Sequence, residues 1–371
     1  MSGIYIHIPF CHSKCAYCDF FSIPEKKSRE GFADAVSKEW DMRRHELSDS
    51  EITTIYVGGG TPSILTPGEL EAIVSPIPKS SLSEFTVEAN PEDVTAHWVS
   101  SMRSLGVDRI SIGVQSLNDR ELAAVGRRHT AAEALDAIET ILRGGISNIS
   151  ADLIYGLPGQ TIDTWRDSLE RLLQRGITHL SAYALSYEQG TRLYAMLMTG
   201  KIKEIPQEVS EQMYDMLCKY TTRRGFTHYE ISNFALPGKH SRHNSSYWDY
   251  TPYLGLGPGA HSFDGEMRRV NPPGVAAYIA AINSGKTFYT VEEETTTDRI
   301  NDLIITSLRT SHGLNQEAVE KIGGSKSLSE LRKNADPFIS SGRLLCTDST
   351  MRIPEKYWLI SDAILRDLLL E

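Results

Sequence analysis

The sequence predicts an α/β fold in which six strand–helix units form a partial, TIM-like (β/α)6 barrel, followed by a smaller helical domain. Two observations predict the barrel: short β-rich runs alternate with helical stretches, and residues suited to ligand binding follow the ends of those runs. A change to a helix-rich pattern near residue 296 predicts the second domain. A doubly wound parallel sheet is the main alternative architecture.

The expected strands are short runs of β-branched and aromatic residues, some of them apolar enough for burial on both sides. They lie at 4–8, 54–57, 84–89, 109–114, 148–154 and 180–185. The expected helices between them lie at 29–45, 67–74, 91–105, 131–143 and 161–175. Alternation at this spacing indicates βαβ units and a parallel sheet, and six such units suit an open barrel.

After the sixth unit the pattern predicts a helix at 207–223 and one more strand at 228–234. Residues 237–273 are rich in Gly, Pro, His and aromatic residues, which favours a functional loop over a linker. The last part resembles a winged helix, with helices at 299–309, 316–322, 328–334 and 361–370 and a hairpin joining 344–347 to 351–353. We therefore expect a barrel at 1–235, a loop region at 236–290 and a C-terminal winged-helix-like domain at 291–371.

Composition narrows the classes of function. The chain has 371 residues and a net charge of −10, so non-specific attraction to nucleic acid is unfavourable and we expect no nucleic-acid partner. Apolar runs fall short of the roughly 18 residues that a membrane span needs, and the start of the chain lacks targeting features, so we expect a cytoplasmic protein without an integral membrane segment. Two lone cysteines, Cys218 and Cys346, are interpreted as small buried hydrophobic residues.

Three cysteines fall close together in the pattern Cys11-x3-Cys15-x2-Cys18. Soft thiolates on one short loop select an iron–sulfur cluster or zinc. Zinc normally takes four protein ligands, and His7 or His12 would have to supply the fourth. An iron–sulfur cluster held by three cysteines leaves one iron open to another ligand, and this open iron is the feature that distinguishes the two interpretations.

Residues suited to binding also end the other expected strands. They are the glycine-rich segment 58–62, Glu88, Asn90, Pro91, Gln115, Asp152 and the segment 155–159. The carboxyl ends of parallel strands meet at one rim of an α/β fold, so these residues are expected to lie together. Glycines let the backbone approach a ligand closely, and the two carboxylates are suited to ribose hydroxyls. The alternative is that each residue only caps the end of its strand.

The cysteine motif, with the aromatic Tyr17 before its last cysteine, resembles the signature of the radical S-adenosylmethionine (SAM) superfamily, where it also follows the first strand. The resemblance implies a radical-SAM barrel and one [4Fe–4S] cluster on Cys11, Cys15 and Cys18. It also implies that the open iron chelates the amino and carboxylate groups of SAM, whose S–C bond an electron from the cluster can cleave.

From residue 4 to residue 248 the chain resembles the oxygen-independent coproporphyrinogen III dehydrogenases and, more closely, their paralogues, the HemW-type haem chaperones. The matching segments are 4–11, 57–63, 87–91, 112–116, 152–160 and 243–248. The resemblance implies a SAM site lined by Tyr5, Gly59, Gly60, Thr61, Glu88, Gln115, Arg127, Asp152 and Ala184.

Two differences from the dehydrogenases favour the haem chaperones. The dehydrogenases carry a further cysteine two residues after Cys18, where this chain has Phe20, and they have an N-terminal extension before the first strand. The motif His243-Asn-x-x-Tyr-Trp248 matches the one that the chaperones use for haem. We therefore expect a chaperone that binds haem and delivers it to acceptor haemoproteins, peripheral contact with membrane haemoproteins included. The dehydrogenase, an oxidative decarboxylase, is the alternative.

The resemblance makes His243 the expected iron ligand, because imidazole is a common axial ligand of haem. One turn of helix would bring Tyr247 to the same face, where its ring can stack on a porphyrin, and Arg242 suits a propionate. Spacing alone favours the alternative that His243 and Asn244 hold a loop in place and Trp248 anchors it in the core, and the family resemblance reverses this preference. Two other histidines are alternative ligands: His240 and His261.

Overall fold

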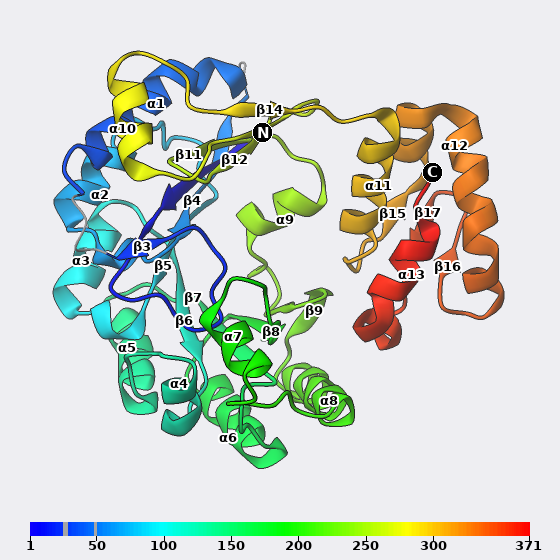
Figure 1. The fold of residues 1–371 in the computed structure, drawn as a ribbon, viewed down its shortest axis with the longest axis horizontal. Helices are drawn as coiled ribbons and strands as arrows, with labels where there is room; N and C mark the ends of the chain where they lie inside the picture. The colour runs from blue at the N-terminus through cyan, green and yellow to red at the C-terminus, as the bar shows by residue number, and fades with distance from the viewer. Residues whose placement is uncertain (25–28, 48–49) are drawn as a thin grey trace.

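The computed structural model describes residues 1–24, 29–47 and 50–371. They form a large α/β unit and a smaller, mainly helical C-terminal unit beside it (Figure 1). In the described part of the chain the main sheet has twelve strands, in the order β14-β13-β12-β11-β1-β4-β5-β6-β7-β8-β10-β9. The two largest apolar clusters of the described residues accompany this division, one within the α/β unit and one within the C-terminal unit.

The six predicted strands are present and pair in parallel, each with the next. They are β1 (Ser2–Ile8), β4 (Ile52–Gly59), β5 (Glu84–Ala89), β6 (Arg109–Gln115), β7 (Asn148–Tyr155) and β8 (His179–Ala184). Their order across the sheet follows the chain without the reversal of a doubly wound fold, so the predicted barrel class is confirmed.

The helices after these strands lie on the outer side of the sheet (Figure 1). They are α1 (Phe32–Arg43), α2 (Pro67–Val74), α3 (Ala96–Ser104), α4 (Asp119–Ala124), α5 (Ala131–Arg143) and α6 (Ile162–Leu173). Local sequence fixes their starts: Thr66 with Glu69 and Thr130 with Glu133 form capping boxes at α2 and α5. The chain continues through α7 (Arg192–Met198), which we did not predict, and α8 (Gln207–Arg223), which we did.

The prediction of a loop at 237–273 is wrong. Within the wider region 236–290 the structure has α9 (Arg242–Trp248), β11 (Tyr253–Leu256), β12 (His261–Phe263), β13 (Arg268–Val270) and α10 (Val275–Asn283). β11 pairs in parallel with β1, and β12, β13 and β14 (Thr290–Glu292) continue the sheet in antiparallel fashion. The region therefore completes one side of the barrel sheet, and the boundary expected at 291 falls inside β14.

The other edge of the sheet also differs from expectation. Residues 228–234, expected as one strand, belong to two strands, β9 (Thr227–Glu230) and β10 (Asn233–Ala235), which pair antiparallel across a short turn. β10 pairs antiparallel with β8, so this hairpin ends the sheet. The chain reverses direction between Glu230 and Asn233. A turn this short does not interrupt the pattern of apolar residues, so the sequence did not reveal it.

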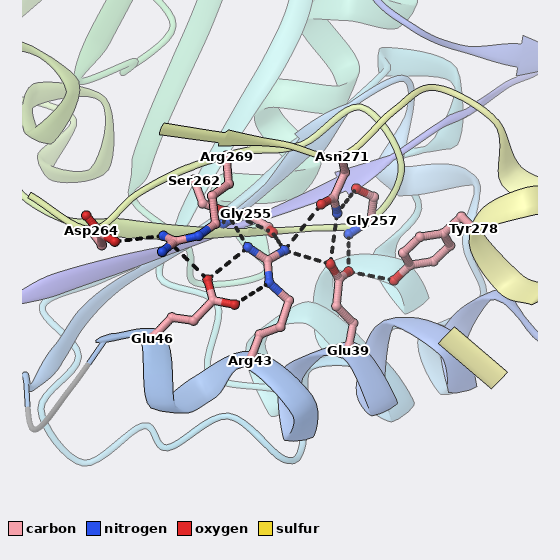
Figure 2. A network of polar contacts seen from close by, with 10 residues as sticks. All are labelled: Glu39, Arg43, Glu46, Gly255, Gly257, Ser262, Asp264, Arg269, Asn271 and Tyr278. Atoms are coloured by element: carbon pink, nitrogen blue, oxygen red, sulfur yellow. Dashed lines mark hydrogen bonds and ion pairs between the residues drawn. The ribbon is translucent and has the colours of Figure 1, made fainter. Parts of the chain in front are cut away.

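A buried polar network joins α1 to the segment after β11 (Figure 2). Glu39 and Arg43, both buried, pair at 2.8 Å across one turn of α1. Glu39 also accepts hydrogen bonds from Asn271 Nδ2 and the Gly257 amide, each at 2.8 Å, and from the Tyr278 hydroxyl at 2.7 Å. The network therefore ties α1 to β11 and to the chain that follows it. β11 is the direct neighbour of β1 in the sheet.

The C-terminal unit has the predicted helices and hairpin around its own core. It contains α11 (Thr296–Ser307), β15 (Leu314–Asn315), α12 (Gln316–Ser340), β16 (Leu345–Cys346), β17 (Thr350–Arg352), the 3-10 helix η4 (Glu355–Ile360) and α13 (Ser361–Leu368). α12 is kinked at Gly324, so the two helices predicted there are present as one broken helix. Cys346 is exposed on the hairpin and its predicted burial is wrong, whereas Cys218 is partly buried against the barrel core.

Within the described residues, no helix combines the length and hydrophobicity that crossing a bilayer requires.

Candidate functional site

A cavity of about 480 Å³ lies at the carboxyl ends of the parallel strands. Its volume is in the range of small-molecule sites, roughly 300–1,000 Å³. The predicted site residues that line it are Cys11, Cys15, Cys18, Gly59, Gly60, Thr61, Glu88, Gln115, Arg127, Asp152 and Ala184. Tyr5 and His243, also predicted, are not among the described residues that line it.

The cysteine loop is closed at its base. β2 (Phe10–Cys11) pairs with β3 (Ile23–Pro24), which holds the two ends of the loop together. In the middle of the loop the Ala16 amide donates to the Val125 carbonyl at 2.9 Å, and the Ala16 carbonyl accepts from the Leu193 amide at 2.8 Å. These contacts fix the loop against the barrel rim, so the three partly exposed thiols line one wall of the cavity.

The glycine segment after β4 packs directly against this loop. A Cβ atom at Gly60 would lie 2.6 Å from the Phe10 carbonyl oxygen and 3.1 Å from Cys11 Sγ. Gly59 has a φ of 106°, and a Cβ atom there would meet the His7 ring at 2.5 Å. Side chains at these positions would push the end of β4 away from His7 and from the cysteine loop, so here the glycines allow close packing within the protein. That they also let the backbone approach a ligand stays a prediction.

Two carboxylates line the floor of the cavity. Glu88 accepts from the Tyr56 hydroxyl at 2.6 Å and from the Gly59 amide at 3.2 Å. Burial raises the pKa of Glu88 to about 7 and that of Asp152 to about 6, and the Ser111 hydroxyl lies 3.4 Å from Asp152. Buried carboxylates at the end of a cavity are suited to accept hydrogen bonds from the hydroxyls of a bound ligand.

Arg127 connects the cysteine loop to the rim. Its guanidinium donates to Asn90 Oδ1 at 2.8 Å and to the Gly113 carbonyl at 2.7 Å, and it lies 3.5 Å from Cys15 Sγ. Gln115 follows a bulge in β6 and has a φ of 65°, a conformation that non-glycine residues seldom adopt. Strained backbone of this kind concentrates at functional sites, and here it accompanies the entry of Gln115 into the cavity.

Sequence reasoning missed several residues of the cavity wall. Asn90 is not one of them, since its place directly after β5 put it at the predicted rim, and it also donates to Thr61 at 3.2 Å. Ser111 lies inside β6 and Tyr183 inside β8, and nothing in the local sequence distinguishes them from other strand residues. Phe20, exposed by 65%, also lines the cavity.

The haem motif forms α9, and the prediction that Tyr247 shares a face with His243 is confirmed, since the Tyr247 hydroxyl lies 3.0 Å from His243 Nε2. The other ring nitrogen lies 2.9 Å from the Thr54 hydroxyl, and the ring stacks on Tyr56 at 5.2 Å between centroids. His243 is fully buried, and burial lowers its pKa to about 3. Iron ligation by His243 would therefore require α9 to move, and it stays a prediction.

The start of α9 is fixed by a buried carboxylate. Glu84 accepts from the backbone amides of Arg242 at 2.8 Å and His243 at 3.1 Å. A carboxylate at a helix N-terminus satisfies free amides and interacts favourably with the helix dipole. The motif helix is thus held at the amino ends of the strands, opposite to the ends that carry the cysteine loop, because Glu84 begins β5 and Thr54 lies early in β4.

The structure is a parallel (β/α)6 barrel with three thiols on the loop after its first strand. A glycine segment and buried carboxylates lie next to these thiols. This combination of fold and site defines a radical SAM protein. The sequence profile of the Radical SAM superfamily matches residues 5–172. The chain is 35% identical over 333 residues to the heme chaperone HemW of Bacillus subtilis strain 168, covering 88% of each chain. It is 30% identical over 377 residues to the HemW of Mycobacterium tuberculosis strain H37Rv, covering 99% of this chain and 94% of that one. The chain belongs to the HemW family.

Among solved structures, coproporphyrinogen III oxidase (HemN) from Escherichia coli matches with a TM-score of 0.83 at 21% identity. The match covers 99% of this chain and 90% of that chain. At this identity it shows that the fold is shared, including the C-terminal unit.

Proposed function

We propose that this protein is a haem chaperone, which binds haem and delivers it to acceptor haemoproteins, and that it carries a SAM-liganded [4Fe–4S] cluster. The observation that carries the proposal is the similarity, over most of the chain, to relatives that are named heme chaperones. The intact motif on α9 supports it. We further propose that the protein is cytoplasmic, with peripheral contact where an acceptor is a membrane haemoprotein.

The cavity fits the cluster and SAM by its donors. Cys11, Cys15 and Cys18 supply the soft thiolates that an iron–sulfur cluster takes, all from one loop. When bound, a cluster with three cysteine ligands supplies an open iron for SAM and an electron for cleaving its S–C bond. Glu88 and Asp152 accept from the ribose hydroxyls, and the remaining predicted residues of the wall exclude water and orient the ligand.

For haem, the hollow beside α9 is the proposed site of entry. It has a volume of about 250 Å³ and is lined by Tyr247, Trp248, Phe263 and Arg268, among others. Flat aromatic faces suit a porphyrin, and a guanidinium suits a propionate. Because the hollow is smaller than the roughly 300–1,000 Å³ of typical ligand pockets, haem binding requires α9 to open, which would also free His243.

Tyr5, predicted at the SAM site, lies on β1 with its hydroxyl 3.0 Å from His7 Nδ1 and its ring near His243. We propose that it supports the cavity from below. His240, stacked on Tyr229, and the exposed His261 stay alternative haem ligands.

The alternative function is oxidative decarboxylation of coproporphyrinogen III. The fold shared with HemN along nearly the whole chain favours it. Phe20 opposes it, since the dehydrogenases have a further cysteine there and this chain places an exposed phenyl ring at the cavity.

One sample can test both functions. Protein reconstituted anaerobically with cluster and SAM is titrated with haem while the Soret band is followed, and then mixed with a haem-free acceptor protein. A second portion is given coproporphyrinogen III and reductant. We expect one haem per chain, its transfer to the acceptor, and no protoporphyrinogen IX.

The variant His243→Ala should bind haem more weakly and shift the Soret band, whereas the exposed control His97→Ala should behave as wild type. An unchanged spectrum and affinity in His243→Ala would remove that residue as ligand. Absence of haem binding by wild type would contradict the chaperone proposal, and formation of protoporphyrinogen would establish the alternative.

A further inference from the structure

A cluster of three side chains joins the barrel to the C-terminal unit, away from the cavity. Cys218 lies on α8, His228 lies on β9 and Glu355 begins η4. One sulfur, one ring nitrogen and one carboxylate oxygen from these residues all lie within 4.8 Å of one another. None of the three lines the cavity or the hollow beside α9, so the proposed function leaves them unused.

The His228 ring is held in a fixed orientation. Its side chain is 4% exposed. The ring stacks on Phe234 with centroids 4.0 Å apart and an interplanar angle of 15°, and it meets Trp358 edge-on at 4.4 Å. Rotation would disrupt both contacts, so the two ring nitrogens keep their directions.

Those directions make Nδ1 the available ligand atom. Nε2 lies 3.3 Å from the Ile231 carbonyl oxygen, which can only accept, so Nε2 carries a hydrogen. The lone pair of Nδ1 then faces Glu355 Oε1 at 2.8 Å. Two acceptors this close share a proton when no metal is bound. A metal ion can take the place of that proton if the two atoms move apart to the roughly 3.3 Å that separates two ligands of a tetrahedral zinc ion. Metal-binding histidines commonly donate their other ring hydrogen to a backbone carbonyl, which is the arrangement seen here.

Cys218 favours the metal ion. A histidine–carboxylate pair alone would account for two of the three groups and would need no thiol beside it. Sulfur, imidazole nitrogen and carboxylate oxygen together are the donors that zinc takes, whereas Ca²⁺ and Mg²⁺ take oxygen alone. Three protein ligands leave a fourth position for water, and the Glu355 side chain, exposed by 54%, provides a route for the ion from solvent.

We propose that Cys218, His228 and Glu355 bind one zinc ion between the barrel and the C-terminal unit. The two units already meet here through backbone hydrogen bonds, Ser311 to Tyr229 at 3.0 Å and Ile231 to Arg309 at 3.1 Å. An ion that binds only the folded arrangement stabilises it by mass action, so zinc holds the C-terminal unit against the barrel.

The test uses the full chain loaded with its iron–sulfur cluster, so that Cys11, Cys15 and Cys18 are occupied. After exposure to zinc and desalting, iron and zinc are measured on the same sample. We expect one zinc per chain in addition to the cluster iron, and a higher Tm with zinc than after chelation. Glu355→Gln should weaken zinc binding by more than the roughly 10–100-fold that loss of a supporting contact costs. Cys218→Ser should abolish it.

Two controls keep the outcomes distinct. Cys346→Ser removes an exposed cysteine elsewhere and should leave zinc binding unchanged. Because Glu355 is exposed, Glu355→Gln should fold normally, and circular dichroism checks this. Cobalt used in place of zinc should give thiolate–metal absorption that Cys218→Ser loses and Cys346→Ser keeps. Zinc-free wild-type protein, or equal zinc affinity in wild type and Glu355→Gln, would overturn the proposal. Neither outcome depends on whether the protein binds haem.

Discussion

Arg43→Met should destabilise the protein far more than the same change at Arg143. Both arginines pair with a glutamate one helical turn earlier at 2.8 Å, Glu39 and Glu139 respectively. The first pair is buried, with side-chain exposures of 1% and 0%, whereas the second is 78% and 36% exposed. The two variants therefore compare the same contact in and out of water.

The contacts of Arg43 determine how much more stability Arg43→Met should lose than Arg143→Met. Arg43 also donates to Glu46 at 2.9 and 3.1 Å, to the Gly255 carbonyl at 3.2 Å and to the Ser262 hydroxyl at 3.1 Å (Figure 2). Methionine would fill much of the space but leave these acceptors, and the buried Glu39 charge, without their cation. Removing one partner of a buried pair costs about 3–5 kcal/mol. An exposed pair contributes about 0–1 kcal/mol, which bounds the cost of Arg143→Met.

Urea unfolding followed by tryptophan fluorescence, to which Trp40 buried on the same helix contributes, would measure both variants. At equal slopes, the shift in midpoint gives the change in free energy of unfolding. Adding Glu39→Gln to Arg43→Met should recover part of the loss, because the unpaired charge is then gone. Equal destabilisation by Arg43→Met and Arg143→Met would refute the reasoning.

Three further predictions concern the cavity. Reconstituted protein should contain about four iron and four sulfide per chain, and alanine at Cys11, Cys15 or Cys18 should abolish this content; zinc without iron would contradict it. Glu88→Ala or Asp152→Ala should weaken SAM binding by about 1–3 kcal/mol, because polar partners are left unsatisfied, and titration calorimetry would measure the change. Burial raises the pKa of Glu88 from 4.5 to about 7, so the folded protein holds a proton that the unfolded chain has lost between these values. Stability should therefore fall as pH rises from 4.5 to about 7, and Glu88→Gln should reduce this slope in urea unfolding; identical slopes in the two proteins would count against it.

Most of the barrel and its rim could be predicted, because their signals are local. The parallel strands are short runs rich in β-branched and aromatic residues. The cysteines follow β1, and Gly59, Glu88 and Asp152 lie in the carboxyl-terminal halves of their strands. The carboxyl ends of parallel strands lie at one rim of the sheet, however the side chains pack. The order of the strands in the sequence was therefore enough to predict that these residues share one cavity.

The main failures come from contacts between residues that lie far apart in the chain. β11 has four residues and pairs with β1, whose partner residues lie some 250 positions earlier, so the Gly- and Pro-rich sequence around it gives no local sign of a strand. The burial of His243 likewise depends on Thr54 and Tyr56 from β4, which no motif spacing reveals. Cys346 lies on a two-residue strand with exposed side chains: Leu344 before it is buried in the C-terminal core, but Leu345 and Cys346 are exposed.

The central claim is that the cysteine loop and the strand ends form one site for a cluster and SAM. The most direct test is the electron paramagnetic resonance spectrum of the reduced, reconstituted protein, recorded before and after SAM is added. We predict a cluster signal that changes on SAM addition, because SAM would ligate the iron that Cys11, Cys15 and Cys18 would leave open, and a weaker response in Glu88→Ala. A cluster signal that stays the same at saturating SAM would contradict the account.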